Sequence, residues 1–353
     1  MILKDIPILN VYYLLCYAWG FIQEQTVSKL ESLKELTHTK DLLGKLLSSG
    51  VNHLVRRGLE RGYIFSEEEY VGIRGKLKLS ETIKRSIQIH GRTVCEYDEL
   101  SADVLPNQIL RATLKLLVDG DSNLDGRIKK DVHWALLRLR DVSDIRLIGN
   151  TFSHIQISGN SRLYRFLIAI CQMLYENSLV DEDAGSTPFY DFRQNDIQMW
   201  RLFERFVIEF FKREQQEFAI KGQTEIEWGQ KASKDEASNA LIPSMFADVI
   251  LESEERRIIL DTKYYRHAVT RGSDQYARKL HSVNLYQLLA YLRNRQATNP
   301  HGPKHEGILL YPEVDSPLRA DVELEGFRIQ ARTLNLNQAW QEIHQEMLET
   351  IKL

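Results

Sequence analysis

Residues 246–265, FADVILESEERRIILDTKYY, constrain the fold of this chain more than any other segment. Two apolar runs flank a short charged stretch, a pattern that predicts a β-hairpin. Three charges break this pattern: Asp248 interrupts the first run, and Asp261 and Lys263 stand at the end of the second. Burying a charge without a partner costs several kcal/mol or shifts its pKa, so these three residues need an explanation.

The pairing of the two runs follows from their composition. If Asp248 lies opposite Asp261, apolar residues and then an ion pair fill the rest of the hairpin. The pairs are Ile250 with Ile259 and Glu252 with Arg257, and residues 253–256 form the turn. Lys263 is two residues beyond Asp261, so the alternation of a strand places all three charges on one face at one end.

Two carboxylates and a lysine at one place indicate metal-dependent chemistry. Like charges repel and need a counter-charge, and Mg²⁺ prefers oxygen ligands while keeping several waters. The pattern therefore predicts a Mg²⁺ site at Asp248 and Asp261. Lys263 could orient or help deprotonate an attacking water and stabilise the charge that develops during phosphodiester hydrolysis.

A structural arrangement could use the same three residues. Asp261 and Lys263 would form an ion pair at the strand end, and Asp248 would accept a hydrogen bond from a backbone amide. For any one residue this alternative is ordinary. The coincidence of all three at this spacing favours the metal site.

The sequence around the hairpin alternates between helical and strand patterns. We expect helices at 195–215, 283–295 and from about 338, and further strands at 218–228, 306–314 and 326–336. This order predicts an α/β domain over residues 161–353, with a mixed central sheet flanked by helices.

The first part of the chain has a different pattern. Helical periodicity covers residues 8–22, 40–59, 101–118 and 129–140. Between them, an alternating stretch that begins at Tyr63 and contains Gly72 and Gly75 predicts an extended β-hairpin. Residues 1–160 are thus expected to form an α+β domain with a β-hairpin extension.

Bulk composition excludes several classes of protein. The net charge is −3, so the chain as a whole lacks the basic footprint of a nucleic-acid-binding domain. Its three cysteines are far apart and suggest neither a disulfide framework nor a zinc site, which favours the cytoplasm. Apolar runs are shorter than the roughly 20 residues of a membrane span, so we expect no membrane association.

Charge is concentrated in one stretch. Residues 71–92 contain six Lys and Arg against one Glu, and they include Arg74, Lys76 and Lys78. This stretch is either a basic contact surface or a solvated hairpin. Its GIRGKLK string lacks the spacing and the Ser or Thr of a P-loop, so we expect this chain to bind no nucleotide triphosphate.

The hairpin resembles the core of the PD-(D/E)xK nucleases. In that comparison Asp248 and Asp261 are the acidic metal ligands and Lys263 is the lysine, while Ala247 replaces the proline that names the motif.

The helix that follows strengthens this resemblance. Gln287 and Tyr291 lie four residues apart on one helical face and match the Gln-x-x-x-Tyr element of the RecB-like branch. An ordinary amphipathic helix with a buried tyrosine is the alternative. The resemblance also makes Glu204 or Glu209 a candidate for an additional acidic metal ligand, although a solvated helix face would explain either residue.

Nearly the whole chain resembles the McrC family, the nuclease subunits of the McrBC modified-cytosine restriction system. The resemblance rests on stretches such as IPILNVYYLLCYAW, VGIRGKLKLSETI and YDELSADVLPNQILRATL, together with the hairpin and NLYQLLAYL. It implies a Mg²⁺-dependent type IV restriction endonuclease subunit. It also implies a hexameric McrB-type AAA+ GTPase partner that binds the GTP, recognises double-stranded DNA with modified cytosine, and is stimulated by this chain.

Under this resemblance, Arg74, Lys76 and Lys78 become candidates for insertion into the GTPase ring. Two other functions stay open. One is a partner-independent RecB-like DNA exonuclease, and the other is a non-catalytic activator or assembly module of an AAA+ ring.

Overall fold

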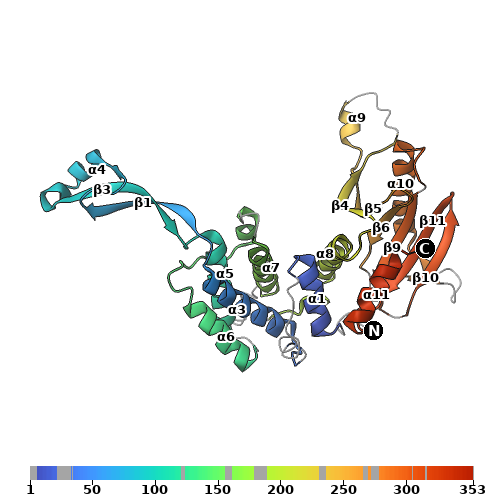
Figure 1. The fold of residues 1–353 in the computed structure, drawn as a ribbon, viewed down its shortest axis with the longest axis horizontal. Helices are drawn as coiled ribbons and strands as arrows, with labels where there is room; N and C mark the ends of the chain where they lie inside the picture. The colour runs from blue at the N-terminus through green and yellow to red at the C-terminus, as the bar shows by residue number, and fades with distance from the viewer. Residues whose placement is uncertain are drawn as a thin grey trace. The chain divides into compact units, whose positions relative to one another are not determined.

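A computed structural model shows two compact units within the chain (Figure 1). Unit 1 combines residues 1–39 with 190–353, and unit 2 consists of residues 40–189. The structure describes residues 6–21, 33, 35–120, 124–155, 161–178, 189–229, 236–264, 269–271, 278–303, 305–314 and 316–352. Within these ranges, no helix is both long and apolar enough to cross a membrane.

Unit 2 is a helical body with a β extension. Its body consists of α3 (Thr39–Arg57), α5 (Leu105–Asp119), α6 (Gly126–Leu137), the 3-10 helix η3 (Gly149–His154) and α7 (Arg162–Asn177). A buried polar network fixes α5 to α7: Tyr164 donates a hydrogen bond to Asn107 Oδ1 at 2.7 Å, and Asn107 Nδ2 donates to the carbonyls of Glu60 and Ala102. Buried polar groups that are satisfied in this way fix one arrangement of the helices.

The extension is a long antiparallel pair with a small insertion at its far end (Figure 1). Its elements are β1 (Gly62–Val71), β2 (Lys76–Leu77), α4 (Leu79–Lys84), the 3-10 helix η2 (Ile87–His90) and β3 (Arg92–Ser101). β1 and β3 pair along their whole length, and β2 adds to the other edge of β3. The alternating stretch is therefore extended as expected, but α4 occupies part of the basic segment where strands were expected.

Unit 1 is built on a mixed six-stranded sheet in the order β10-β11-β9-β6-β5-β4. The strands are β4 (Ala219–Ile226), β5 (Met245–Glu252), β6 (Arg257–Thr262), β9 (His305–Pro312), β10 (Arg319–Leu324) and β11 (Phe327–Leu334). The central β6 and β9 pair in parallel, as do β9 and β11, while the outer neighbours are antiparallel. A separate two-stranded ribbon consists of β7 (Val269–Arg271) and β8 (Arg278–Leu280).

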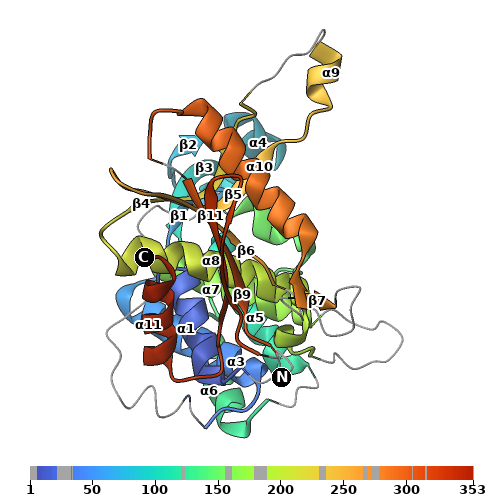
Figure 2. The same ribbon diagram turned by 90° about the vertical axis from the view of Figure 1, so that its right-hand side faces the viewer.

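Helices cover both faces of this sheet. Figure 2 shows the strands between α10 (Ser282–Thr298) on one side and α1 (Ile8–Ala18), α8 (Asp196–Glu214) and α11 (Trp340–Thr350) on the other. Short helices η4 (Phe192–Gln194) and α9 (Glu236–Ala240) complete the unit. Asn195 caps α8, because its side chain accepts hydrogen bonds from two backbone amides of the first turn. The phenylalanines of α8 form its buried face.

The division into units differs from the expected boundary at residue 160. Helix α1 packs with unit 1, because Asn10 Nδ2 donates hydrogen bonds to the carbonyls of Leu336 and Gln338, both at 2.9 Å. Tyr13 also stacks on Trp340 at a centroid distance of 4.4 Å. These partners lie more than 300 residues away, so sequence patterns near the start of the chain cannot indicate them. The mixed sheet flanked by helices is confirmed, although β10 was not expected.

Candidate metal and nuclease site

The β5–β6 hairpin has the register worked out from the sequence. Its ladder joins Val249 to Leu260, Ile250 to Ile259, Leu251 to Ile258 and Glu252 to Arg257. The turn is closed by a hydrogen bond from the Ser253 amide to the Arg256 carbonyl at 2.8 Å. The ladder ends at Val249, so Asp248 and Asp261 lie just beyond its last regular pair, at the end away from the turn.

Asp248 interacts directly with the neighbouring strand. Its Oδ2 accepts hydrogen bonds from the backbone amide and the hydroxyl of Thr262, both at 2.7 Å. This contact fixes the Asp248 carboxylate beside Asp261. Thr262 was not among the expected site residues, although it is the central residue of the Asp-Thr-Lys string.

Asp261 is the most buried charge of the group, at 1% exposure. Lys263 Nζ lies 2.6 Å from its Oδ2. Among the described residues, its Oδ1 has no hydrogen-bond partner. Burial is the main cause that raises the pKa of Asp261, to about 7; Lys263 opposes the shift, while Asp248 and Glu204 add to it.

The structure distinguishes the two candidate glutamates of α8. Glu204 is 6% exposed, and burial followed by the negative charge of Asp248 raises its pKa. Glu204 therefore lies near the hairpin carboxylates. Glu209 instead forms an ion pair with Lys212 on the same helix at 2.9 Å, and its side chain is 35% exposed. The aromatic contact between Phe203 and Tyr264 helps to fix this part of α8 beside the end of β6.

Gln287 and Tyr291 share a face of α10, as their spacing predicts. The Gln287 amide donates a hydrogen bond to the Tyr291 hydroxyl. Burial raises the pKa of Tyr291, and the charges of Asp261 and Asp248 add to the shift. The pair therefore faces the carboxylates from the opposite side of the sheet to α8.

The donor set is compatible with a magnesium ion, but the described residues form no complete cage. Within the described ranges, no three His, Cys, Asp or Glu side chains are grouped closely enough to hold a metal ion. Asp261 nevertheless buries an oxygen that has no hydrogen-bond partner among the described residues, and such an atom calls for an ion or water. Mg²⁺ needs only one or two carboxylates because it keeps several waters, so Asp248 and Asp261 fit it.

The contacts expected for a purely structural role are also present. Asp261 forms an ion pair with Lys263, and Asp248 accepts a hydrogen bond from the Thr262 backbone amide. Those contacts explain one oxygen of each carboxylate. They do not explain why Asp261 Oδ1 is buried without a hydrogen-bond partner among the described residues, or why Glu204 is buried nearby. These two observations favour the metal site.

Comparison with known proteins identifies the family. A sequence profile for the "McrBC 5-methylcytosine restriction system component" matches residues 10–312, most of the chain. The chain belongs to this McrBC family.

A curated relative agrees with this assignment, and a solved structure has a similar fold. The chain is 35% identical over 344 residues to the "Type IV methyl-directed restriction enzyme EcoKMcrBC" of Escherichia coli K12, covering 98% of this chain and 97% of the relative. Its fold is similar to a chain in an assembly of Thermococcus gammatolerans McrB AAA+ hexamers with bound McrC. That match has 18% identity and a TM-score of 0.57, and it covers 99% of this chain and 79% of the other.

One further residue beside these carboxylates was not expected from the sequence. Gln223 of β4 donates a hydrogen bond from Nε2 to Glu204 Oε1 at 3.0 Å. A glutamine in an exposed position of a strand carries no local signal for such a role. The contact depends on how α8 packs against β4.

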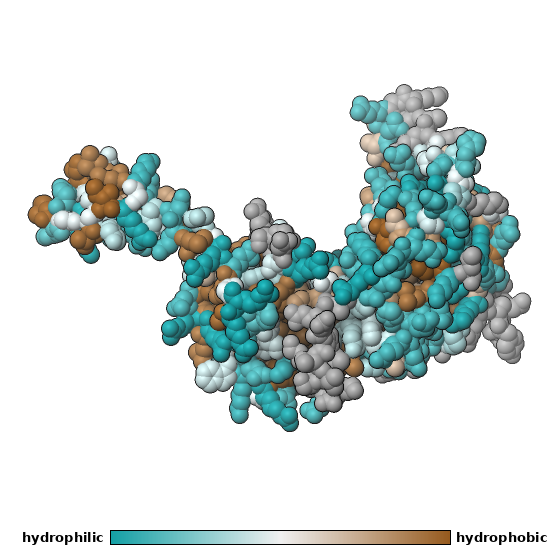
Figure 3. Space-filling model, in the orientation of Figure 1, coloured by the Kyte–Doolittle hydropathy of each residue, from teal (hydrophilic) through white to brown (hydrophobic). Residues whose placement is uncertain are grey.

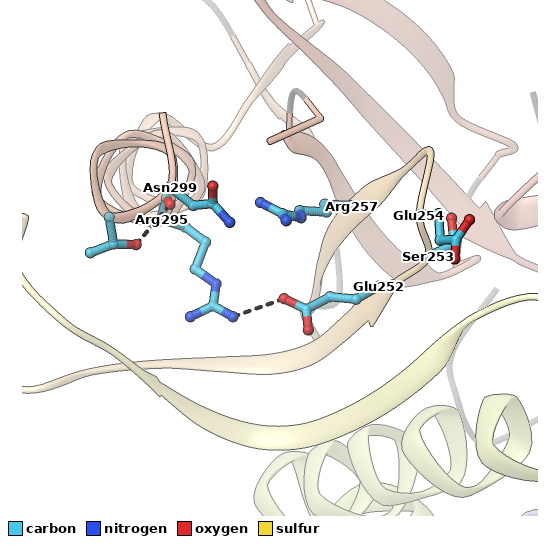
Figure 4. A pocket seen from close by; sticks show the side chains of 7 residues that line it. Glu252, Ser253, Glu254, Arg257, Arg295 and Asn299 are labelled. Carbon is cyan, nitrogen blue, oxygen red and sulfur yellow. Dashed lines mark hydrogen bonds and ion pairs between the residues drawn. The ribbon is translucent and has the colours of Figure 1, made fainter. Parts of the chain in front are cut away.

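A pocket at the opposite end of the hairpin contains none of these residues (Figure 4). It has a volume of about 710 Å³ and is lined by Glu252, Ser253, Glu254, Arg257, Arg295, Thr298 and Asn299. Arg295 Nη2 forms an ion pair with Glu252 at 2.8 Å across it. It lies beside the β5–β6 turn and is separate from the carboxylates.

The three basic residues expected to contact a partner lie in the extension of this McrBC-family chain. Lys78 Nζ lies 2.9 Å from Glu67 and also contacts Glu96, and Lys76 Nζ lies 3.6 Å from Glu96. Arg74 lies over the Tyr97 ring at 4.0 Å. Glutamates of β1 and β3 thus balance much of the basic charge.

The far end of the extension is apolar instead (Figure 3). We call this surface the apolar tip; its residues, each more than half exposed, are Val71, Ile73, Leu79, Ile83 and Ile89. Exposed apolar residues grouped in this way are typical of a protein–protein contact.

Proposed function

We propose that this chain is the Mg²⁺-dependent DNA endonuclease subunit of a GTP-dependent restriction complex that acts on DNA containing modified cytosine. The observation that carries the proposal is the buried Asp261 carboxylate beside Asp248, Lys263 and Glu204 on a mixed sheet. Membership of the McrBC family supports it, as does the restriction activity named for the E. coli relative.

Each residue has a distinct role in this proposal. Asp248 and Asp261 would hold the Mg²⁺ ion, and Glu204 would be the additional acidic residue beside them. When bound, the ion supplies positive charge at the scissile phosphate and lowers the pKa of water. Lys263 orients the attacking water and stabilises the negative charge that develops on the phosphate oxygens. Tyr291, positioned by Gln287, supports the site from α10.

The proposal assigns GTP binding to another subunit. Because this chain has no P-loop string, we propose a hexameric AAA+ GTPase of the McrB type as its partner. The T. gammatolerans assembly pairs such hexamers with McrC. The extension is the proposed contact, through the apolar tip and through Arg74, Lys76 and Lys78, and through it the chain stimulates GTP hydrolysis.

The test is an Asp261→Ala substitution, assayed in the complex with the proposed McrB-type GTPase partner. We expect DNA cleavage to fall by at least about 100-fold on methylated DNA, because the metal loses a ligand. GTPase stimulation should stay at the parent level. Asp321→Ala is the matched control, since Asp321 is also a strand aspartate paired with a basic residue, Arg328, but lies on β10. Cleavage by Asp261→Ala at the parent rate would refute the assignment.

A further inference from the structure

Strand β4 contains an irregularity opposite Asp248. The β4–β5 ladder pairs Gly222 with Val249 and Thr224 with Ala247, but the intervening pair, Gln223 with Asp248, is missing. Gln223 has a φ of 45°, one of three positive values among the described non-glycine residues. A non-glycine residue in the left-handed region is strained, and such strain is often found at functional sites.

The irregularity switches the face that β4 presents. A Cβ on Gly222 would lie 2.7 Å from Ile208 Cγ2, so Gly222 faces α8. Ile226 packs instead in the apolar cluster that contains Leu288 and Leu292 of α10. Residues four apart in a regular strand share a face, so the strand must turn over between Gly222 and Ile226.

The turned backbone also decides where the Gln223 side chain goes. Gly222 already faces α8, so in a regular strand Gln223 would point to the opposite face. The left-handed conformation lets Gln223 reach the same side, where its amide donates to Glu204 Oε1 at 3.0 Å. Glu204 and Ile208 lie one turn apart on α8, so the close contact at Gly222 and the hydrogen bond at Gln223 act on the same stretch of helix.

We propose that Gln223 is a positioning residue of the metal site, whose left-handed backbone holds the Glu204 carboxylate beside Asp248. This inference rests on the proposed nuclease function. It assigns to Gln223 no contact with substrate. Its effect is on the affinity for the divalent cation, because a free Glu204 would adopt other rotamers and lose its fixed position near the ion.

The test measures Mn²⁺ binding to the full-length chain by electron paramagnetic resonance, together with thermal unfolding without metal. Gln223→Gly removes the amide and suits the left-handed backbone, while Gln223→Asn tolerates that backbone but has a shorter side chain. We expect both variants to bind Mn²⁺ about 10-fold more weakly. Gln223→Gly should unfold at no lower temperature than the parent.

Gln345→Ala is the matched control, because Gln345 makes the same kind of amide–carboxylate hydrogen bond to Glu349 on α11. It should bind Mn²⁺ like the parent. Unchanged Mn²⁺ affinity in both Gln223 variants would overturn the inference, with or without a change in unfolding temperature.

An Asp261→Asn variant in the same titration separates this inference from the proposed function. If Asp261→Asn loses the ion while the Gln223 variants keep it, only the role of Gln223 is refuted. If Asp261→Asn binds Mn²⁺ like the parent, the proposed nuclease centre is wrong and the role of Gln223 falls with it.

Discussion

Asp261 is a residue whose ionised form lowers the free energy of unfolding. Its carboxylate is almost fully buried, and one of its oxygens has no hydrogen-bond partner within the described part of the chain. Burial therefore raises its pKa to about 7, although Lys263 lies beside it. Without a metal, ionising this group at neutral pH costs folding free energy.

The sign of the pH dependence follows from this shift. A carboxyl group with a raised folded-state pKa stabilises the protein while it is protonated, and that stabilisation is lost as the pH rises through about 7. We expect Asp261→Asn without Mg²⁺ to raise the free energy of unfolding by about 1 kcal/mol above pH 8. The gain should disappear below about pH 4. Urea denaturation across this pH range measures it, and a gain that is the same at both ends would contradict the prediction.

The site residues differ in how far the sequence could reveal them. Asp248, Asp261 and Lys263 lie on one hairpin, so alternation and register bring them together without knowledge of the rest of the fold. Glu204 and Glu209 could not be separated, because both fit an amphipathic helix until its packing is known. No sequence pattern indicated Gln223, since its proposed role depends on one backbone dihedral angle.

At the scale of elements, the contact between α8 and β4 sets the position of Glu204. Gly222 allows this contact, because a Cβ there would lie 2.7 Å from Ile208 Cγ2. Most helices and sheet strands were predictable because their apolar periodicity is strong. Strand β10 was missed, since most of its residues are exposed and it lacks an apolar run.

A double-mutant cycle tests this contact. We expect Gly222→Ala to lower the free energy of unfolding by about 1–3 kcal/mol through overpacking, and Ile208→Ala to lower it by about 2–4 kcal/mol through a cavity. The double variant should lose at least about 1 kcal/mol less unfolding free energy than the sum of the two single losses, because the cavity leaves room for the added methyl group. Gly149→Ala, where a Cβ meets no atom within 4 Å, is the control. Strict additivity in denaturant unfolding would show that the two residues do not touch.

The extension shows the limit of composition as a guide. The stretch over residues 71–92 has an excess of basic residues, but acidic residues of β1 and β3 lie across from them. Strand pairing therefore balances a charge that looks unbalanced in the sequence. What the pairing leaves exposed at the far end is apolar, and no local pattern in the sequence distinguishes these residues from a core.

At the scale of the whole molecule, the two units divide the proposed functions between them. The carboxylates all belong to unit 1, and the extension belongs to unit 2. A change at the apolar tip should therefore affect the partner and leave the metal site intact.

The variant Ile73→Ser with Ile89→Ser tests this division, since both side chains are exposed and contribute little to folding. We expect GTPase stimulation to fall by about 10-fold or more, because an apolar contact to the partner is lost. GTP-dependent cleavage should fall with it, while Mn²⁺ affinity of the isolated chain stays at the parent value. Leu241→Ser, at an exposed apolar residue directly after α9 in unit 1, is the control. Full GTPase stimulation by the tip variant would refute the apolar contact.

A separate assay uses the isolated parent chain. Metal-dependent cutting of linear DNA without the partner would favour a RecB-like exonuclease.

The discontinuity of unit 1 has a consequence for the order of synthesis. Helix α1 is synthesised more than 300 residues before its partners Leu336, Gln338 and Trp340. Unit 2 is contiguous and can fold as soon as it emerges. A nascent chain therefore can form the extension, the proposed partner contact, before it can assemble the carboxylates of the proposed nuclease centre.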